Sequence, residues 1–75
     1  MKYILTAIVD DIQQYFVEYL NGIPQFIVDK NLASYYGNID EVRAQCHRLK
    51  YTVIALNLNV KNIAIVNVEL ENYIL

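Results

Sequence analysis

Apolar residues occupy both sides of the segment 14–29, which reads QYFVEYLNGIPQFIVD. The pair Asn21-Gly22 at its centre is typical of a type I′ turn, in which both residues need a positive φ. The pattern therefore predicts a β-hairpin with strands at 14–20 and 23–28. A hairpin that is apolar on both sides raises the question of what its second face contacts.

The turn also predicts which hairpin residues lie opposite one another. The expected pairs are Leu20 with Ile23, Tyr19 with Pro24, Glu18 with Gln25, Val17 with Phe26, and Phe16 with Ile27. At its position Pro24 exchanges no hydrogen bond within the hairpin, so its missing N–H faces outward. We therefore expect Pro24, Phe26 and Val28 on an edge strand, because an inner strand would need that donor.

Two more strands and one long helix are predicted outside the hairpin. Residues 2–9 and 62–71 are rich in β-branched residues, which fits a first and a last strand. Between them, apolar residues recur at alternating spacings of three and four over about 39–57, the pattern of an amphipathic helix. Asn38 is expected to cap this helix. A competing interpretation makes the β-rich residues 51–58 a strand.

The predicted order is β-β-β-α-β, in one α+β domain spanning residues 1–75. The first three strands are expected to be antiparallel neighbours, and the helix then returns the chain so that the last strand runs parallel to the first. The right-handed crossover rule favours the strand order 3-2-1-4. The fold expected is a two-layer sandwich, with a four-stranded mixed sheet and one long helix on one face.

Alternation along the strands assigns each residue to one of two sheet faces. The uncharged face, expected to meet the helix, carries Tyr3, Leu5, Ala7, Val9, Tyr15, Val17, Tyr19, Phe26, Val28, Ala64, Val66, Val68 and Leu70. The opposite face adds eight large apolar residues to its polar ones: Ile4, Ile8, Phe16, Leu20, Ile23, Ile27, Ile63 and Ile65. Soluble monomers rarely expose so much apolar surface. We therefore expect this face to pack on a second copy, as a homodimer, or on a protein target.

The amino-acid composition also indicates that part of the surface binds a partner. The chain is 56% hydrophobic, above the ~45–50% of ordinary domains, although 75 residues form only a thin core. Among its tyrosines, Tyr35, Tyr36, Tyr51 and Tyr73 are the freer candidates for contact with a partner. The net charge of −2 argues against nucleic acid as that partner.

Residues that carry chemistry are sparse, so we expect no enzyme, cofactor or metal site. The only cysteine and the only histidine, Cys46 and His47, are helix neighbours whose side chains point about 100° apart, and they are too few for a structural zinc site. Arg43, His47 and Lys50 fall on one flank of the helix. They are candidate contacts for an anion or an acidic partner, or simply a solvated flank.

The chain is expected in the cytoplasm, without membrane contact. A single cysteine fits a reducing compartment, and no apolar run approaches the ~20 residues that cross a bilayer. The first residues, MKYILTAIVDD, lack the basic region and cleavage site of a signal peptide.

The stretches YFVEYLNGIPQFIVD, NLASYYGNIDEV and LNVKNIAIVNVEL together resemble small phage-encoded accessory proteins of unknown function. The matching residues are Asn21, Gly22, Phe26, Asp29, Ala33, Tyr36 and Glu41. The chain departs from that pattern in having fewer charges in its helix and a Tyr-Ile-Leu tail. The resemblance implies a phage origin, a place in the host cytoplasm, and binding to a host or defence protein.

The leading hypothesis is a non-enzymatic protein-interaction module that inhibits or modulates a host or antiviral-defence protein. One alternative is a dimer that encloses or sequesters a nucleotide-like ligand among tyrosine side chains. A second alternative is a structural subunit of a larger assembly.

Overall fold

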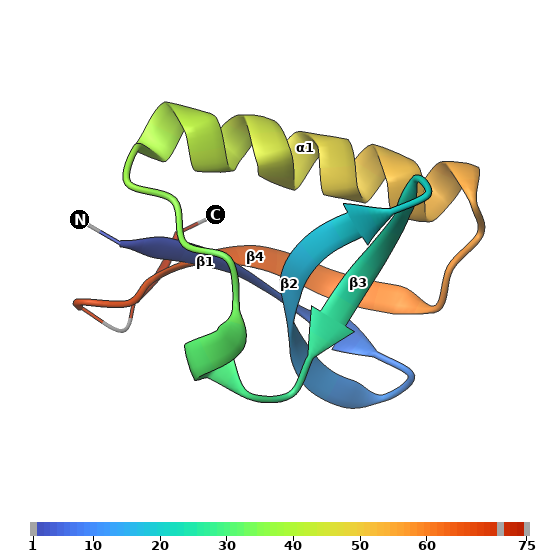
Figure 1. Cartoon of the computed structure of the whole chain (residues 1–75), viewed down its shortest axis with the longest axis horizontal. Helices are drawn as coiled ribbons and strands as arrows, with labels where there is room; N and C mark the ends of the chain where they lie inside the picture. The colour runs from blue at the N-terminus through green and yellow to red at the C-terminus, as the bar shows by residue number, and fades with distance from the viewer. Residues whose placement is uncertain (1, 71, 75) are drawn as a thin grey trace.

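A computed structural model describes residues 2–70 of the chain and the backbone of residues 72–74. The elements are β1 (Tyr3–Val9), β2 (Ile12–Leu20), β3 (Ile23–Ile27), a short 3₁₀ helix η1 (Lys30–Leu32), α1 (Ile39–Ala55), β4 (Val60–Asn67) and β5 (Asn72–Ile74). The strands form one sheet in the order β3-β2-β1-β4-β5, and α1 covers one face of it (Figure 1). The predicted α+β sandwich and the strand order 3-2-1-4 are confirmed, and β5 extends the sheet beyond β4.

The predicted mixed sheet is wrong, because β4 runs antiparallel to β1. The chain returns before the helix begins, within the connection 28–38. There Tyr36 and Tyr3 each donate a backbone N–H to the other's carbonyl, both at 2.8 Å, which places the start of α1 beside the start of β1. The helix then runs the length of β1, and β4 comes back in the opposite direction.

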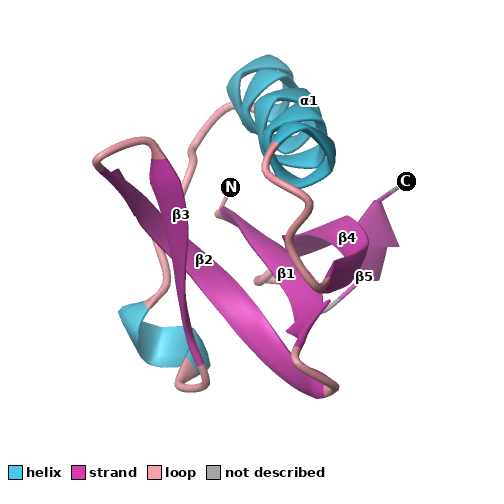
Figure 2. Cartoon of the chain, turned by 90° about the vertical axis from the view of Figure 1, so that its right-hand side faces the viewer, coloured by secondary structure: helices cyan, strands magenta, loops and turns pink. Residues whose placement is uncertain are grey.

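Residues 34–36 fill a gap in the sheet. The pairing of β2 with β1 ends at Tyr15, and from there β2 and β3 diverge from β1 and β4, so that the sheet forms a V beneath α1 (Figure 2). The Ser34 N–H donates to the carbonyl of Phe16 at 3.2 Å, and its hydroxyl donates to the carbonyl of Val17. This segment therefore satisfies backbone groups that β1 and β2 no longer offer each other.

A β-bulge at Val17 changes the register of the hairpin. The turn at Asn21-Gly22, with φ of 53° and 78°, and its first three predicted pairs are confirmed. Beyond the bulge, however, Phe16 lies opposite Phe26 and Tyr15 opposite Ile27, so the two remaining predicted pairs are wrong. The extra residue lets Phe16 and Tyr19 face the same side, with ring centroids 5.0 Å apart.

Local sequence accounts for both ends of α1. The predicted cap is confirmed, since Asn38 Oδ1 accepts the N–H of Asp40 at 2.8 Å and that of Glu41 at 3.2 Å. At the other end Asn57 takes a left-handed φ of 53°, and the Leu58 N–H donates to the carbonyl of Val53 at 3.0 Å. Residues 51–55 are therefore helical, and the competing strand interpretation is wrong.

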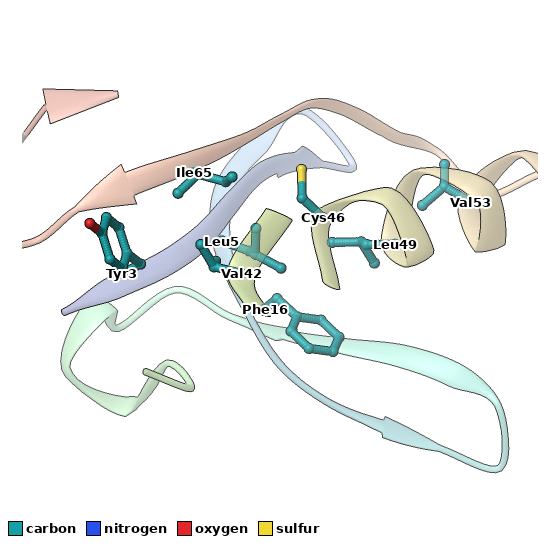
Figure 3. Packing of buried hydrophobic residues seen from close by; sticks show 8 residues of the cluster. All are labelled: Tyr3, Leu5, Phe16, Val42, Cys46, Leu49, Val53 and Ile65. Atoms are coloured by element: carbon teal, nitrogen blue, oxygen red, sulfur yellow. The ribbon is translucent and has the colours of Figure 1, made fainter. Parts of the chain in front are cut away.

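The core lies between α1 and the sheet (Figure 3). Its buried members are Tyr3, Leu5, Phe16, Val42, Cys46, Leu49, Val53 and Ile65. The predicted inward positions of Tyr3 and Leu5 on β1 are confirmed, but Phe16 and Ile65 were expected on the opposite face. The bulge turns Phe16 inward, and the pairing of Leu5 with Ile65 puts those two side chains on one face.

Conversely, two residues that were expected to face the helix lie on the outer face of the sheet. Tyr15 lies opposite Thr6, and Val66 lies opposite Ile4, so both belong to the outer face. Ile4 is on that outer face and is nevertheless fully buried. The sheet therefore lacks the broad, exposed apolar face that alternation along regular strands predicts.

Candidate functional site

The eight predicted interface residues of the sheet do not form one surface. Ile4, Phe16 and Ile65 are buried, Ile8, Ile27 and Ile63 are half-buried, and Leu20 and Ile23 are exposed near the hairpin turn. Ile63, like Ile65, packs against the core beneath α1. The exposed apolar face on which the sheet-on-sheet homodimer was predicted is therefore absent from the described residues.

The predicted edge strand is confirmed for Pro24 and Phe26, since β3 is the first strand of the sheet and pairs with β2. Val28 lies just beyond its end and is exposed. Pro24 itself is buried, and it lies opposite Tyr19 as predicted.

The four tyrosines proposed for contact are distributed over different parts of the molecule. Tyr35 is exposed and has the Lys2 ammonium 5.3 Å from its ring centroid. Tyr36 is half-buried, and burial raises the pKa of its phenol. The side chain of Tyr73 lies outside the described residues. Of the three whose side chains are described, Tyr51, which is 75% exposed on α1, offers the largest part of its ring to a partner.

The last turns of α1 carry the most exposed apolar side chains in the described part of the chain. Ile54 is 79% exposed, and Tyr51 and Leu56 are exposed with it. Ile54 follows the buried Val53, and successive helical residues point about 100° apart, so Ile54 turns away from the core.

A groove lies beside Ile54, between α1 and β4. It has a volume of about 390 Å³ and is lined by Lys50, Val53, Ile54, Val60, Asn62 and Ile63. Its sheet side stays uncovered because β5, as described, pairs only with Ile65, Val66 and Asn67. The first half of β4 therefore has no neighbouring strand on its outer side among the described residues.

A second hollow of about 200 Å³ continues along the same flank of α1. Arg43, Cys46, His47, Lys50 and Ile65 line it. Lys50 lines both hollows, so they form one surface, which we call the α1–β4 groove. Arg43, His47 and Lys50, which were singled out in the sequence, lie together there, beside the apolar half that the sequence did not predict.

Charge is unevenly distributed along the chain. Between Val42 and Val68 there are four lysines and arginines and no acidic residue, whereas all eight acidic residues lie outside that range. Arg43 and Lys50 are exposed, and neither forms an ion pair with a described acidic residue. This gap in the acidic residues is the sequence feature that could have located the groove.

Cys46 lies at the floor of the groove and is only 6% exposed. Burial raises the pKa of its thiol, and the nearby Lys50 offsets part of that rise. The thiol is therefore protonated at neutral pH, in a state that is a poor nucleophile or metal ligand.

No family model matches the chain, and no curated protein or solved structure shows a significant match to it. Within residues 2–70, no three histidine, cysteine, aspartate or glutamate side chains gather where a metal ion could bind. None of the described helices has the length and apolar character needed to cross a membrane.

Proposed function

We propose that this protein is a non-enzymatic interaction module that binds a partner protein through the α1–β4 groove. The observation that carries the proposal is the exposure of Ile54 in the wall of an apolar hollow, with Tyr51 exposed on the same turn of α1. Burying such side chains gains roughly 25 cal/mol per Å² of apolar surface, and aromatic residues are favoured where proteins bind one another. Because the sequence pattern resembles that of small phage-encoded accessory proteins, we further propose that the module comes from a phage. It would then act in the host cytoplasm on a host or antiviral-defence protein.

The chemistry of the groove supports binding rather than catalysis. Its one thiol is buried and protonated, and its other polar residues, Arg43, His47, Lys50 and Asn62, include no carboxylate. General acid–base catalysis needs a side chain that is held in position, and no hydrogen bond from another described residue holds the exposed His47.

A photo-crosslinking experiment tests this function. Benzoylphenylalanine at position 54 should crosslink a distinct protein from a bacterial lysate, and excess wild-type protein should compete, whereas excess Ile54→Asp should not. The matched control places the same probe at Leu32, which is 59% exposed on η1, away from the groove. Equal crosslinking at both positions, or competition by both proteins, would contradict the proposal.

A second candidate function is supported by the cationic half of the groove. Arg43, His47 and Lys50 surround a hollow large enough for a phosphate group, which fits the sequestering of a nucleotide-like ligand. The dispersed tyrosines weigh against a ligand enclosed by aromatic rings. A thermal-shift screen against nucleotides distinguishes the two functions, because a tight ligand raises the melting temperature by mass action.

A further inference from the structure

Building on the proposed function, we infer the chemistry of the partner. The α1–β4 groove binds a short protein segment that has acidic side chains at one end and apolar side chains at the other. The carboxylates contact Arg43, His47 and Lys50, and the apolar side chains pack on Val53, Ile54 and Ile63.

Charge complementarity carries the acidic part of this inference. The chain as a whole is acidic, with a net charge of −2, yet the groove presents cationic side chains and is lined by no carboxylate. A partner segment with carboxylates meets attraction in the groove, whereas the acidic residues, which all lie outside residues 42–68, repel it elsewhere. Such a charge pattern directs a ligand to one site and rejects wrong partners.

The dimensions of the groove set the length of the segment. Arg43 and Ile54 are eleven residues apart on α1, which corresponds to roughly 16 Å at a rise of 1.5 Å per residue. An extended peptide covers that distance with about five residues at 3.3 Å each. The acidic positions are therefore expected within about five residues of the apolar ones.

Recognition is expected through side chains rather than through addition of a strand to β4. The pairing of β1 with β4 shifts between Thr6 and Ile8, and Asn62 has a left-handed φ of 53°. A bulge of this kind disrupts the regular row of hydrogen-bonding groups that an added strand needs, and the adjacent Lys61 also protects an edge.

A second copy of the chain fits the groove less well. In the described residues the exposed acidic and apolar stretch Asp10-Asp11-Ile12 has the required composition. It lies in the tight turn between β1 and β2, where Asp10 and Asp11 have left-handed φ values of 51° and 68°. This stretch is therefore not the extended segment that the length of the groove requires.

A displayed library of random dodecapeptides tests the inference on the intact chain. Selected peptides should combine aspartate or glutamate with leucine, isoleucine, valine or phenylalanine within about five residues. Lys50→Glu should weaken their binding about tenfold or more, as should raising the salt concentration. Ile54→Ser should weaken it independently, and thermal melts should show that both variants are folded, because both positions are exposed.

Lys2→Glu is the matched control. It makes the same change of charge, and its side chain lies over Tyr35 rather than in the groove. Binding by this variant should match the wild type.

Three outcomes overturn the inference. Selected peptides without an excess of acidic residues, but dependent on Ile54, would refute the acidic partner while leaving the interaction function standing. A library that yields no binder dependent on Ile54 or Lys50 would refute both. Self-association of the wild type that Lys50→Glu abolishes, measured by sedimentation, would identify a second copy as the occupant.

Discussion

The two flanks of helix α1 meet the sheet in different ways. On the flank toward β2 and β3, the Arg48 guanidinium lies 4.1 Å from the ring centroid of Tyr19, and the ring of Phe16 lies 5.0 Å from Tyr19 and 6.0 Å from Phe26. On the flank toward β4, Lys50 and Ile54 border a groove instead. One helix thus has one filled flank and one open flank.

The difference comes from the strands rather than from the helix. The bulge at Val17 directs both Phe16 and Tyr19 toward α1, and these large rings occupy the space beneath Arg48. On the other side β4 supplies shorter side chains, Val60 and Ile63, and β5 covers only its far end. A binding surface can therefore arise where aromatic side chains are missing, without any special feature of the helix.

Truncating the filled flank should have the largest effect. Phe16→Ala removes a buried ring that contacts two others, and should lower the free energy of unfolding by about 3–5 kcal/mol. The matched change on the open flank, Ile54→Ala, should stay within about 0.5 kcal/mol because Ile54 is exposed. Urea unfolding measures both, and equal losses would show that the flanks are packed alike.

The helix cap should support both flanks together. Asn38→Ala leaves the N–H groups of Asp40 and Glu41 without their acceptor and should cost about 1 kcal/mol. Asn38→Asp is the control, because aspartate offers the same acceptor. An unchanged melting temperature in the alanine variant would mean that the cap contributes nothing in solution.

Removing one positive charge from each flank should reveal a smaller difference in stability between the filled and the open flank. Arg48→Met keeps a long apolar stem but loses the contact with the Tyr19 ring, and should cost about 0.5–1 kcal/mol. Lys50→Met on the open flank should cost less. Thermal melts in matched buffers compare the two, and a larger loss for Lys50→Met would reverse the assignment of the flanks.

The smallest expected change in the free energy of unfolding is the one caused by raising the pH. Burial raises the pKa of Cys46, so the folded protein holds this proton more tightly than the unfolded chain does. Its contribution to stability is complete below the ordinary thiol pKa and is lost as the pH rises toward the raised value. Urea unfolding at about pH 7 and about pH 10 should show a shallower loss in Cys46→Ala than in the wild type. Parallel profiles would argue that the thiol is solvated in the folded state.

Sequence reasoning succeeded where the determining interactions are local. Asn38, the pair Asn21-Gly22 and the edge position of Pro24 each act through a few neighbouring residues, and the structure places them as predicted. The apolar spacing of α1 also located the buried stripe.

The features that the sequence could not predict depend on pairing between residues far apart in the chain. The bulge at Val17 and the direction of β4 depend on which backbone groups meet across the sheet, and both change which side chains face the helix. Of the groove, helical spacing could find only the polar flank of Arg43, His47 and Lys50. Its apolar half depends on how far β5 extends along β4.

The meeting of Tyr3 and Tyr36 also sets the order in which the chain assembles. The strands β1, β2 and β3 follow one another through short turns, so closing their contacts loses little chain entropy. The pairing of β1 with β4 joins residues about sixty positions apart, so closing it loses more chain entropy. This loss becomes small only after residues 34–36 have attached to β1 and α1 has formed. We therefore expect the three-stranded meander to form early, β4 to dock last, and the groove to exist only in the fully folded protein.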